Sequence, residues 1–234
     1  MSKYTIAHLF ADHGVEAEAL STLGDVFRFT IEPETNQFDV ESFEIDLMES
    51  APAGRFDLVF CHPKCTRWSD MPGVDPDDHE NQIERAREIA RSIGDAYVIE
   101  NKPRAPLHDP VRLNGRMFGL PIDYERAFES NFPIQQPTYN QPINSKTVTP
   151  YYYSDRTTEW WSSVKGVRGD YPKQHIAKNA LPSAYTEYIG RQWLESLETR
   201  DAKIPQDNNS RAPRKVADSQ RTLIEAANTG KVDQ

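Results

Sequence analysis

The sequence predicts an α/β fold in which a mostly parallel sheet carries helices on both faces. In the first hundred residues, short apolar segments alternate with segments of helical spacing. Glycines close the helical segments, as is common at helix C-termini. The chain of 234 residues also holds ten Phe, ten Tyr and four Trp, which is enough bulk for a core. Sites in such sheets gather at the carboxyl ends of the strands, so we search the loops that follow them.

The first three predicted strands lie before residue 48. Tyr4 to Phe10 is apolar and predicts a strand that ends in a short polar loop. Residues 15–23 have helical spacing and stop at Gly24. Val26 to Ile31 predicts the second strand, and Phe43 to Leu47 predicts a weaker third one.

The next elements carry the strongest apolar signals in the chain. Phe56 to Cys61 predicts a buried strand, and a Pro-rich loop follows it. His79 to Ile93 predicts a helix that ends before Gly94 and places its apolar residues on one face. Ala96 to Ile99 predicts another buried strand. The order strand, helix, strand favours parallel neighbours.

The second half of the chain differs from the first in its composition. Residues 102–150 are rich in Pro and Asn, and we expect loops there with a short strand near Arg126 to Glu129. Tyr185 to Leu197 predicts a helix. We therefore expect one domain over residues 1–198, in which residues 132–181 form a small insert. Residues 199–234 predict a polar, disordered tail with a short helix near Thr222 to Ala227.

Composition excludes several classes of protein. Lys and Arg total 27 and Asp and Glu total 36, so the net charge is −9. This balance argues against a passive nucleic-acid coat protein, which would be basic, but not against an enzyme with a local basic cleft. No apolar run approaches the length of a membrane span, and the first ten residues do not form a secretory signal. The two cysteines, Cys61 and Cys65, cannot make a disulfide framework, so we expect a reducing, cytoplasmic setting.

A thiol and a carboxyl group follow two neighbouring predicted strands. Cys65 stands on the loop after one strand, and Glu100 ends the next. The separation, 100 − 65 = 35 residues, matches one loop, one helix and one strand. The two groups should therefore lie side by side at one edge of the sheet.

The segments around these residues resemble the cytosine-C5 DNA methyltransferases, specifically the short forms that viruses and mobile elements encode. The family's Pro-Pro-Cys-Gln loop appears as Pro63-Lys64-Cys65-Thr66, and its Glu-Asn-Val appears as Glu100-Asn101-Lys102. Leu113 to Leu120, then Arg126 to Ser130, and finally Pro182 to Gly190 are similar to three later family segments. The resemblance covers residues 4 to 197 in order.

The resemblance implies a Rossmann-like methyltransferase fold that uses S-adenosylmethionine and carries a small recognition insert. It also implies that the Cys65 thiolate adds to carbon 6 of a flipped cytosine in DNA, so that carbon 5 can accept a methyl group. Glu100 would hold or protonate ring N3, and Arg126 would orient the base carbonyl or the Cys loop. Lys64 and Arg67 would favour the thiolate form of Cys65. We expect a monomer with no metal and no membrane partner, located in the host cytoplasm if the protein is viral.

The resemblance also points to a cofactor site, at which the sequence departs from the family. The family's Phe-x-Gly-x-Gly loop stands here as Phe10-Ala11-Asp12-His13-Gly14, so Asp12 replaces a glycine, and the resemblance implies that it would face the methionine end of the cofactor. Glu32 would meet the ribose hydroxyls, since Thr30 occupies the family's acid position. Asp46 would meet the adenine amino group, and Pro63 would complete the site.

Other interpretations of the same residues stay open. The changes at Asp12 and Lys64 also fit a catalytically decayed relative that binds DNA or a protein, and the short insert also fits an enzyme acting on free pyrimidine nucleotides. Cys61, His62, Cys65 and His79 lack a second pair at structural zinc spacing. The aromatic residues of 151–161 are expected to pack. Five cations in the insert could still form a nucleic-acid contact surface: Arg156, Lys165, Arg168, Lys173 and Lys178.

Overall fold

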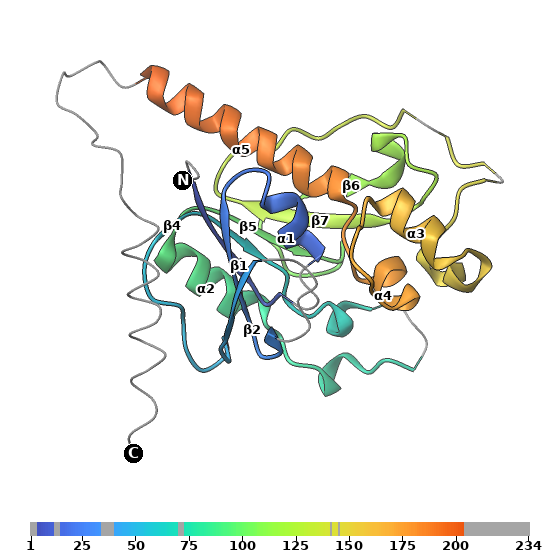
Figure 1. Ribbon diagram of the computed structural model, residues 1–234, viewed down its shortest axis with the longest axis horizontal. Helices are drawn as coiled ribbons and strands as arrows, with labels where there is room; N and C mark the ends of the chain where they lie inside the picture. Colours follow the sequence, from blue (N-terminus) through green and yellow to red (C-terminus); the bar gives the residue numbers. More distant parts are fainter. Residues whose placement is uncertain are drawn as a thin grey trace.

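The computed structural model describes residues 4–11, 15–33, 40–69, 73–140, 142–144 and 146–203, with side chains up to residue 200. Within these ranges seven strands form one sheet in the order β3-β2-β1-β4-β5-β7-β6, as Figure 1 shows in part. The strands are β1 (Thr5–Leu9), β2 (Asp25–Thr30), β3 (Glu41–Glu44), β4 (Phe56–Cys61), β5 (Gly94–Asn101), β6 (Val111–Asn114) and β7 (Glu125–Ser130). All neighbours from β3 to β5 pair in parallel, whereas β7 runs antiparallel to both β5 and β6. The predicted mostly parallel sheet is confirmed.

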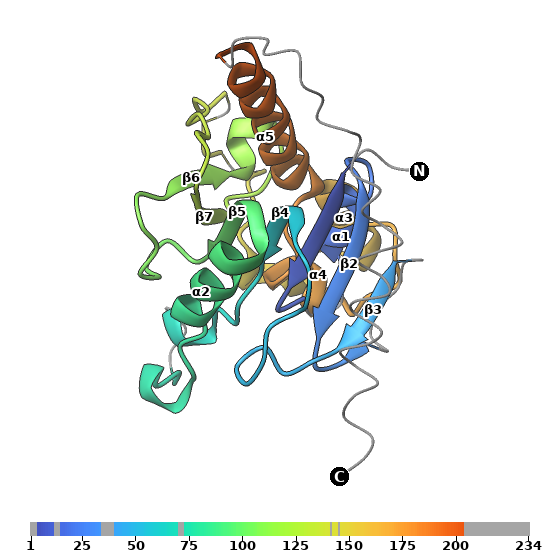
Figure 2. The same ribbon diagram turned by 90° about the vertical axis from the view of Figure 1, so that its left-hand side faces the viewer.

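Helices cover both faces of this sheet. The helices are α1 (Val15–Leu20), α2 (Ile83–Ile93), α3 (Thr158–Lys165), α4 (Lys173–Lys178) and α5 (Ser183–Lys203). Helix α2 packs on β4 and β5 from one side, and α1 and α5 contact each other on the other side (Figure 2). Each face has its own apolar core, because alternate residues of β4 and β5 point to opposite sides: Leu58 and Val98 to one, Val59 and Ile99 to the other.

The predicted boundaries agree best where apolar residues run without interruption. Strand β4 spans the predicted residues, while α2 begins at Ile83 rather than at His79. The four residues before α2 do not join it, because they serve the turn that leads into it. The Asn81 side chain accepts from the Ile83 N–H at 3.2 Å, and the His79 N–H donates to the Pro76 carbonyl.

The later elements differ more from the expectation. The sequence analysis did not predict β6, α3 or α4, and α5 continues to Lys203 instead of ending at Leu197. The helix therefore crosses the boundary expected at residue 198, and the expected short helix at Thr222 to Ala227 lies outside the described residues. None of the helices in the described ranges combines the length and the apolar character that crossing a membrane requires.

The strand order reverses between β1 and β4, and this position determines where ligands can enter. Ligands of open α/β sheets bind outside the carboxyl ends of the strands at such a switch point. The loops that follow β1, β2, β3, β4 and β5 all leave the sheet at this edge, because the five strands are parallel. Phe10 directly follows β1 with φ of 54°, a left-handed conformation that turns the chain away from the sheet.

Candidate active site

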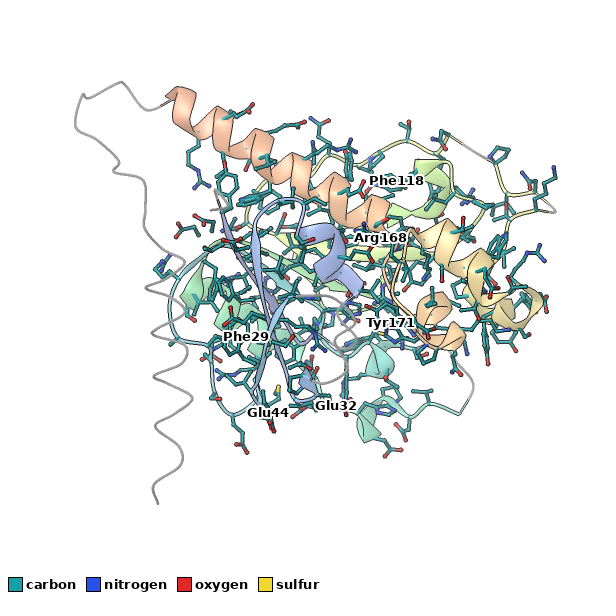
Figure 3. All side chains as sticks on the ribbon, viewed as in Figure 1. Phe29, Glu32, Glu44, Phe118, Arg168 and Tyr171 are labelled. Atoms are coloured by element: carbon teal, nitrogen blue, oxygen red, sulfur yellow. The ribbon has the colours of Figure 1, made fainter. Side chains whose placement is uncertain are left out.

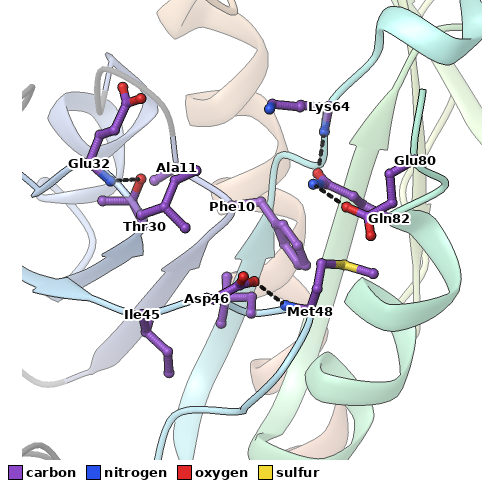
Figure 4. A pocket seen from close by; sticks show the side chains of 12 residues that line it. Phe10, Ala11, Thr30, Glu32, Ile45, Asp46, Met48, Lys64, Glu80 and Gln82 are labelled. Atoms are coloured by element: carbon purple, nitrogen blue, oxygen red, sulfur yellow. Dashed lines mark hydrogen bonds between the residues drawn. The ribbon is translucent and has the colours of Figure 1, made fainter. Parts of the chain in front are cut away.

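A first pocket of about 280 Å³ lies at the carboxyl ends of β1, β2 and β3. Three predicted cofactor residues line it together: Phe10 after β1, Glu32 after β2 and Asp46 after β3 (Figure 4). The pairing of β2 with β3 explains why the two carboxylates converge. Thr30 pairs with Glu44, Glu32 lies two residues after Thr30, and Asp46 lies two residues after Glu44. Figure 3 labels Glu32 and Glu44, which mark the carboxyl ends of β2 and β3.

The walls of the first pocket are apolar and its rim is acidic. Ile45, Leu47 and Met48 supply the apolar surface of the pocket, whereas Glu32 and Asp46 are exposed to solvent. The Asp46 carboxylate accepts from the Met48 N–H at 2.9 Å, which fixes its direction. This set can hold a ligand that has one flat apolar part and several hydroxyl or amino donors.

Of the other predicted cofactor residues, Pro63 does not line this pocket. Asp12 and Gly14 lie outside the described residues. Pro63 is buried and its carbonyl accepts from the Asn101 side-chain amide at 3.0 Å, so it holds the loop after β4 against β5. Lys64, the next residue, lines the pocket instead, and its N–H donates to the Gln82 side chain at 2.9 Å.

A second pocket of about 660 Å³ holds the predicted nucleophile. Cys65, which is half-buried, lines it from the loop after β4, and Arg126 lines it from β7. Lys102 and Tyr124 line the same pocket. Cys65 and Arg126 therefore line one opening, although they are 126 − 65 = 61 residues apart, whereas Glu100, which the sequence analysis placed beside Cys65, does not line it.

Arg126 and Glu100 form a buried ion pair at the base of this pocket. The Arg126 Nε donates to the Glu100 carboxylate, and both side chains are at most 1% exposed. Burial alone would lower the pKa of Arg126, but the charge of Glu100 outweighs it and holds that pKa well above its usual value. Glu100 itself does not line the pocket and reaches it through Arg126. Among the described residues, the Arg126 Nη2 has no hydrogen-bond partner.

A line of buried polar groups continues from Glu100 into the protein. The His62 Nε2 lies 3.5 Å from the Glu100 carboxylate, and its Nδ1 lies 3.4 Å from Glu16 on α1. The far oxygen of Glu16 lies 3.8 Å from the His8 Nε2 on β1. Sequence analysis missed this line, because its members come from four separate elements. The only sequence signal was a charged or polar residue within each apolar segment.

The line predicts a pH-dependent contribution of Glu16 to stability. Burial alone would raise the pKa of Glu16, but His62, His8 and the Leu181 N–H outweigh it and bring the pKa well below 4.5. A carboxyl group with a lowered folded-state pKa stabilises the fold above its unfolded pKa and loses that contribution as the pH falls. We expect Glu16→Gln to unfold at lower urea concentration than the wild type at pH 7. The difference should shrink steadily below about pH 4.5. A constant difference between pH 7 and pH 3 would contradict this expectation.

The cations that share a pocket with Cys65 do not include the two that the sequence suggested. Lys64 lines the first pocket, and Arg67 donates to the Pro76 and His79 carbonyls at 2.6 Å each and pairs with Asp77. Lys102 occupies the second pocket beside Cys65, and its Nζ donates to the Ser69 hydroxyl at 2.9 Å. Its position directly after Glu100-Asn101 was the available signal.

The expected basic surface of the insert holds only in part. Lys165 is buried rather than exposed, and its Nζ donates to the Ala177 and Ala180 carbonyls at 2.9 and 2.6 Å. Arg168 pairs with Glu18 on α1. Trp161 is fully buried, as expected for a packing residue, whereas Tyr151 and Tyr152 are exposed, contrary to that expectation. In the described part of the chain, no group of three or more His, Cys, Asp or Glu side chains could hold a metal ion.

Comparisons with known proteins bear on the fold. No protein-family model and no curated protein sequence matches the chain. Solved structures do match, and two of them superimpose over most of the chain. The Entamoeba histolytica methyltransferase EhMeth superimposes with a TM-score of 0.57 at 10% identity, over 84% of this chain and 99% of that one. A Spodoptera frugiperda DNMT2 mutant superimposes with a TM-score of 0.57 at 9% identity, over 82% of this chain and 99% of that one.

These likenesses extend over most of the chain. Identities of 9% and 10% bear on architecture alone. The predicted fold is thereby confirmed: the chain has the α/β, Rossmann-like fold of the methyltransferases, with a mostly parallel seven-stranded sheet.

Proposed function

We propose that the chain transfers a methyl group from S-adenosylmethionine to carbon 5 of cytosine in DNA, through a covalent adduct with Cys65. One observation carries this proposal. A thiol from the loop after β4 and a buried arginine from β7 line one pocket, and that arginine pairs with the carboxylate at the end of β5. The Arg126 Nη2 is buried with no hydrogen-bond partner in the described part of the chain, so a polar ligand atom could satisfy it.

The first pocket supports the choice of cofactor. Its apolar walls suit an adenine ring, and Glu32 and Asp46 can accept hydrogen bonds from ribose hydroxyls and from an amino group. Lys64 lines the first pocket and Cys65 the second, so the two pockets meet at one loop. When bound, S-adenosylmethionine supplies an electrophilic methyl group on a sulfonium sulfur.

The residues of the second pocket divide the remaining work. The Cys65 thiolate adds to carbon 6 of the pyrimidine, which breaks the double bond to carbon 5 and makes carbon 5 nucleophilic. Arg126 donates to the base carbonyl, and Glu100, which does not line the pocket, orients Arg126 through their buried ion pair. After carbon 5 is methylated, loss of its proton restores the double bond and expels Cys65. The target base leaves the duplex to enter the pocket.

Covalent trapping tests the proposal. We would incubate the full chain with S-adenosylmethionine and a pool of random-sequence duplexes that contain 5-fluorocytosine. Fluorine at carbon 5 cannot leave as a proton does, so the adduct should persist and appear as a protein band of higher mass. Cys65→Ser should give no adduct, whereas Cys61→Ser should retain it, because Cys61 is buried in the core on the α2 side.

The remaining arms of the experiment separate the competing functions. Trapping by 5-fluoro-dCMP, with none by DNA, would replace the proposal with an enzyme that acts on free nucleotides. If neither substrate is trapped and calorimetry detects no binding of S-adenosylmethionine, the chain is a catalytically inactive binding module.

A further inference from the structure

We propose that Lys102 is the base that removes the proton from carbon 5 after methyl transfer, a role that rests on the proposed function. The resembled family has Val at the position of Lys102, so this role comes from the structure of this chain alone. The step needs a basic group that reaches the substrate and loses its own proton readily. Lys102 meets both conditions by its position and its surroundings.

Position is the first condition. Lys102 is half-buried at the end of β5 and lines the second pocket together with Cys65 and Arg126. Its Nζ is held by the Ser69 hydroxyl at 2.9 Å, and Ser69 lines the same pocket. Lys102 makes no ion pair with a carboxylate in the described part of the chain. The amine is thus directed to the pocket without being neutralised by a fixed acid.

Electrostatics is the second condition. Burial lowers the pKa of Lys102, and the positive charges of Arg126 and Lys178 lower it further. The charges of Cys65 and Glu100 act in the opposite direction. The basicity of Lys102 is therefore coupled to the state of Cys65. While Cys65 is a thiolate, the ammonium form is favoured. Once the sulfur has bonded to carbon 6, that negative charge is gone and Lys102 releases its proton to solvent more readily.

The proton balance of the elimination then closes. The neutral Lys102 amine takes the proton from carbon 5, and the electron pair of that C–H bond forms the double bond to carbon 6. The bond from carbon 6 to sulfur breaks, and its electron pair returns Cys65 to the thiolate. The products are 5-methylcytosine, a thiolate and an ammonium, so the favourable charge pair is restored.

The two pockets also place Lys102 on the appropriate side of the base. A methyl group that arrives from one face of the ring turns the hydrogen on carbon 5 toward the opposite face. Lys64 lines the cofactor pocket, whereas Lys102 lines only the pocket of the nucleophile. Of these two lysines, Lys102 is the one placed to meet that hydrogen.

A titration that needs no substrate tests the coupling. We would label the full chain with ¹³C at lysine Cε, assign the Lys102 signal by its loss in Lys102→Arg, and follow it between pH 7 and 11. Lys102 should titrate at lower pH than an ordinary exposed lysine, and at lower pH still in Cys65→Ser. A Lys102 midpoint that does not respond to Cys65→Ser would overturn the proposal, whatever the enzymatic activity.

A second measurement separates the elimination from the earlier steps. Lys102→Arg keeps the positive charge but cannot act as a base. It should trap 5-fluorocytosine DNA at close to the wild-type rate. Turnover of ordinary cytosine DNA should be slower by about 10²–10⁴-fold, the usual contribution of a general base. The variant should also accumulate a protein–DNA adduct that already carries the methyl group, which mass spectrometry would detect.

The outcomes distinguish the two proposals. Lys146→Arg is the matched control and should behave as the wild type in both assays. Normal turnover by Lys102→Arg, with normal trapping by the wild type, would refute the role of Lys102 and leave the proposed function standing. Absence of trapping by the wild type would overturn both.

Discussion

Arg126→Met should slow adduct formation by about 10²–10³-fold and lower the free energy of unfolding by about 3–5 kcal/mol, the typical cost of breaking a buried ion pair. The substitution keeps an unbranched apolar side chain but leaves Glu100, which is fully buried, without its cation. It also removes a hydrogen-bond donor from the second pocket. Loss of one such donor slows catalysis by about 10²–10³-fold in comparable sites. Urea unfolding and the rate of 5-fluorocytosine trapping measure the two effects.

The double variant Arg126→Met with Glu100→Met separates folding from chemistry. Replacing both members of a buried pair with apolar residues is often neutral or stabilising, because no charge remains buried. Stability should therefore recover toward the wild-type value while trapping remains as slow as in Arg126→Met. If the double variant traps 5-fluorocytosine as the wild type does, neither side chain takes part in the reaction.

Arg87→Met should destabilise the protein by a similar amount, about 3–5 kcal/mol, without slowing the trapping reaction of the folded molecules. Arg87 on α2 and Glu129 on β7 form a bidentate pair, with distances of 2.8 and 2.7 Å, on the opposite face of the sheet. Both side chains are at most 3% exposed. The pair ties α2 to the antiparallel edge of the sheet, and neither residue lines a described pocket.

The comparison of these two arginines is itself informative. Glu129 also accepts from the His108 N–H at 2.9 Å, so its oxygens are used within the protein. Arg126, by contrast, keeps one buried nitrogen without a partner among the described residues. The trapping rate of Arg87→Met is to be measured without urea, at a temperature at which the variant is fully folded. A rate slower than that of the wild type would contradict a purely structural role for this pair.

The fold could be predicted from the sequence where local pattern and burial agree. Phe56 to Cys61 is an apolar run between turn residues, and its strand was predicted to the residue. Strand β6 has only four residues, and two of them are buried. It forms by pairing with β7, a separate segment of the chain, so its own residues give too short a pattern to predict it. Helices α3 and α4 are short and depend on contacts such as the burial of Lys165. Tertiary packing determines such elements, so the local sequence pattern does not predict them.

The candidate site was predictable to the extent that strand ends determine it. Cys65, Glu32 and Asp46 directly follow strands, and the parallel sheet brings them to one edge. The family-like segments beyond them mostly serve packing. Gly115 leaves room for Ile122, whose side chain would lie 2.5 Å from an added Cβ, and the Tyr185 hydroxyl donates to the Tyr124 carbonyl at 2.5 Å. A sequence motif alone does not distinguish the residues that line the site from the residues that pack the fold around it.

The loop after β4 gives the molecule a property that neither pocket has by itself. Two consecutive residues, Lys64 and Cys65, face different pockets, while Gln82 and Asn101 anchor the loop on either side. A ligand in one pocket that displaces the loop after β4 changes the space available in the other pocket. Thermodynamic linkage then requires that each ligand alter the affinity of the other by the same factor. Donor and acceptor would thus be bound as a mutually dependent pair, and the order of their arrival would affect the rate but not the final occupancy.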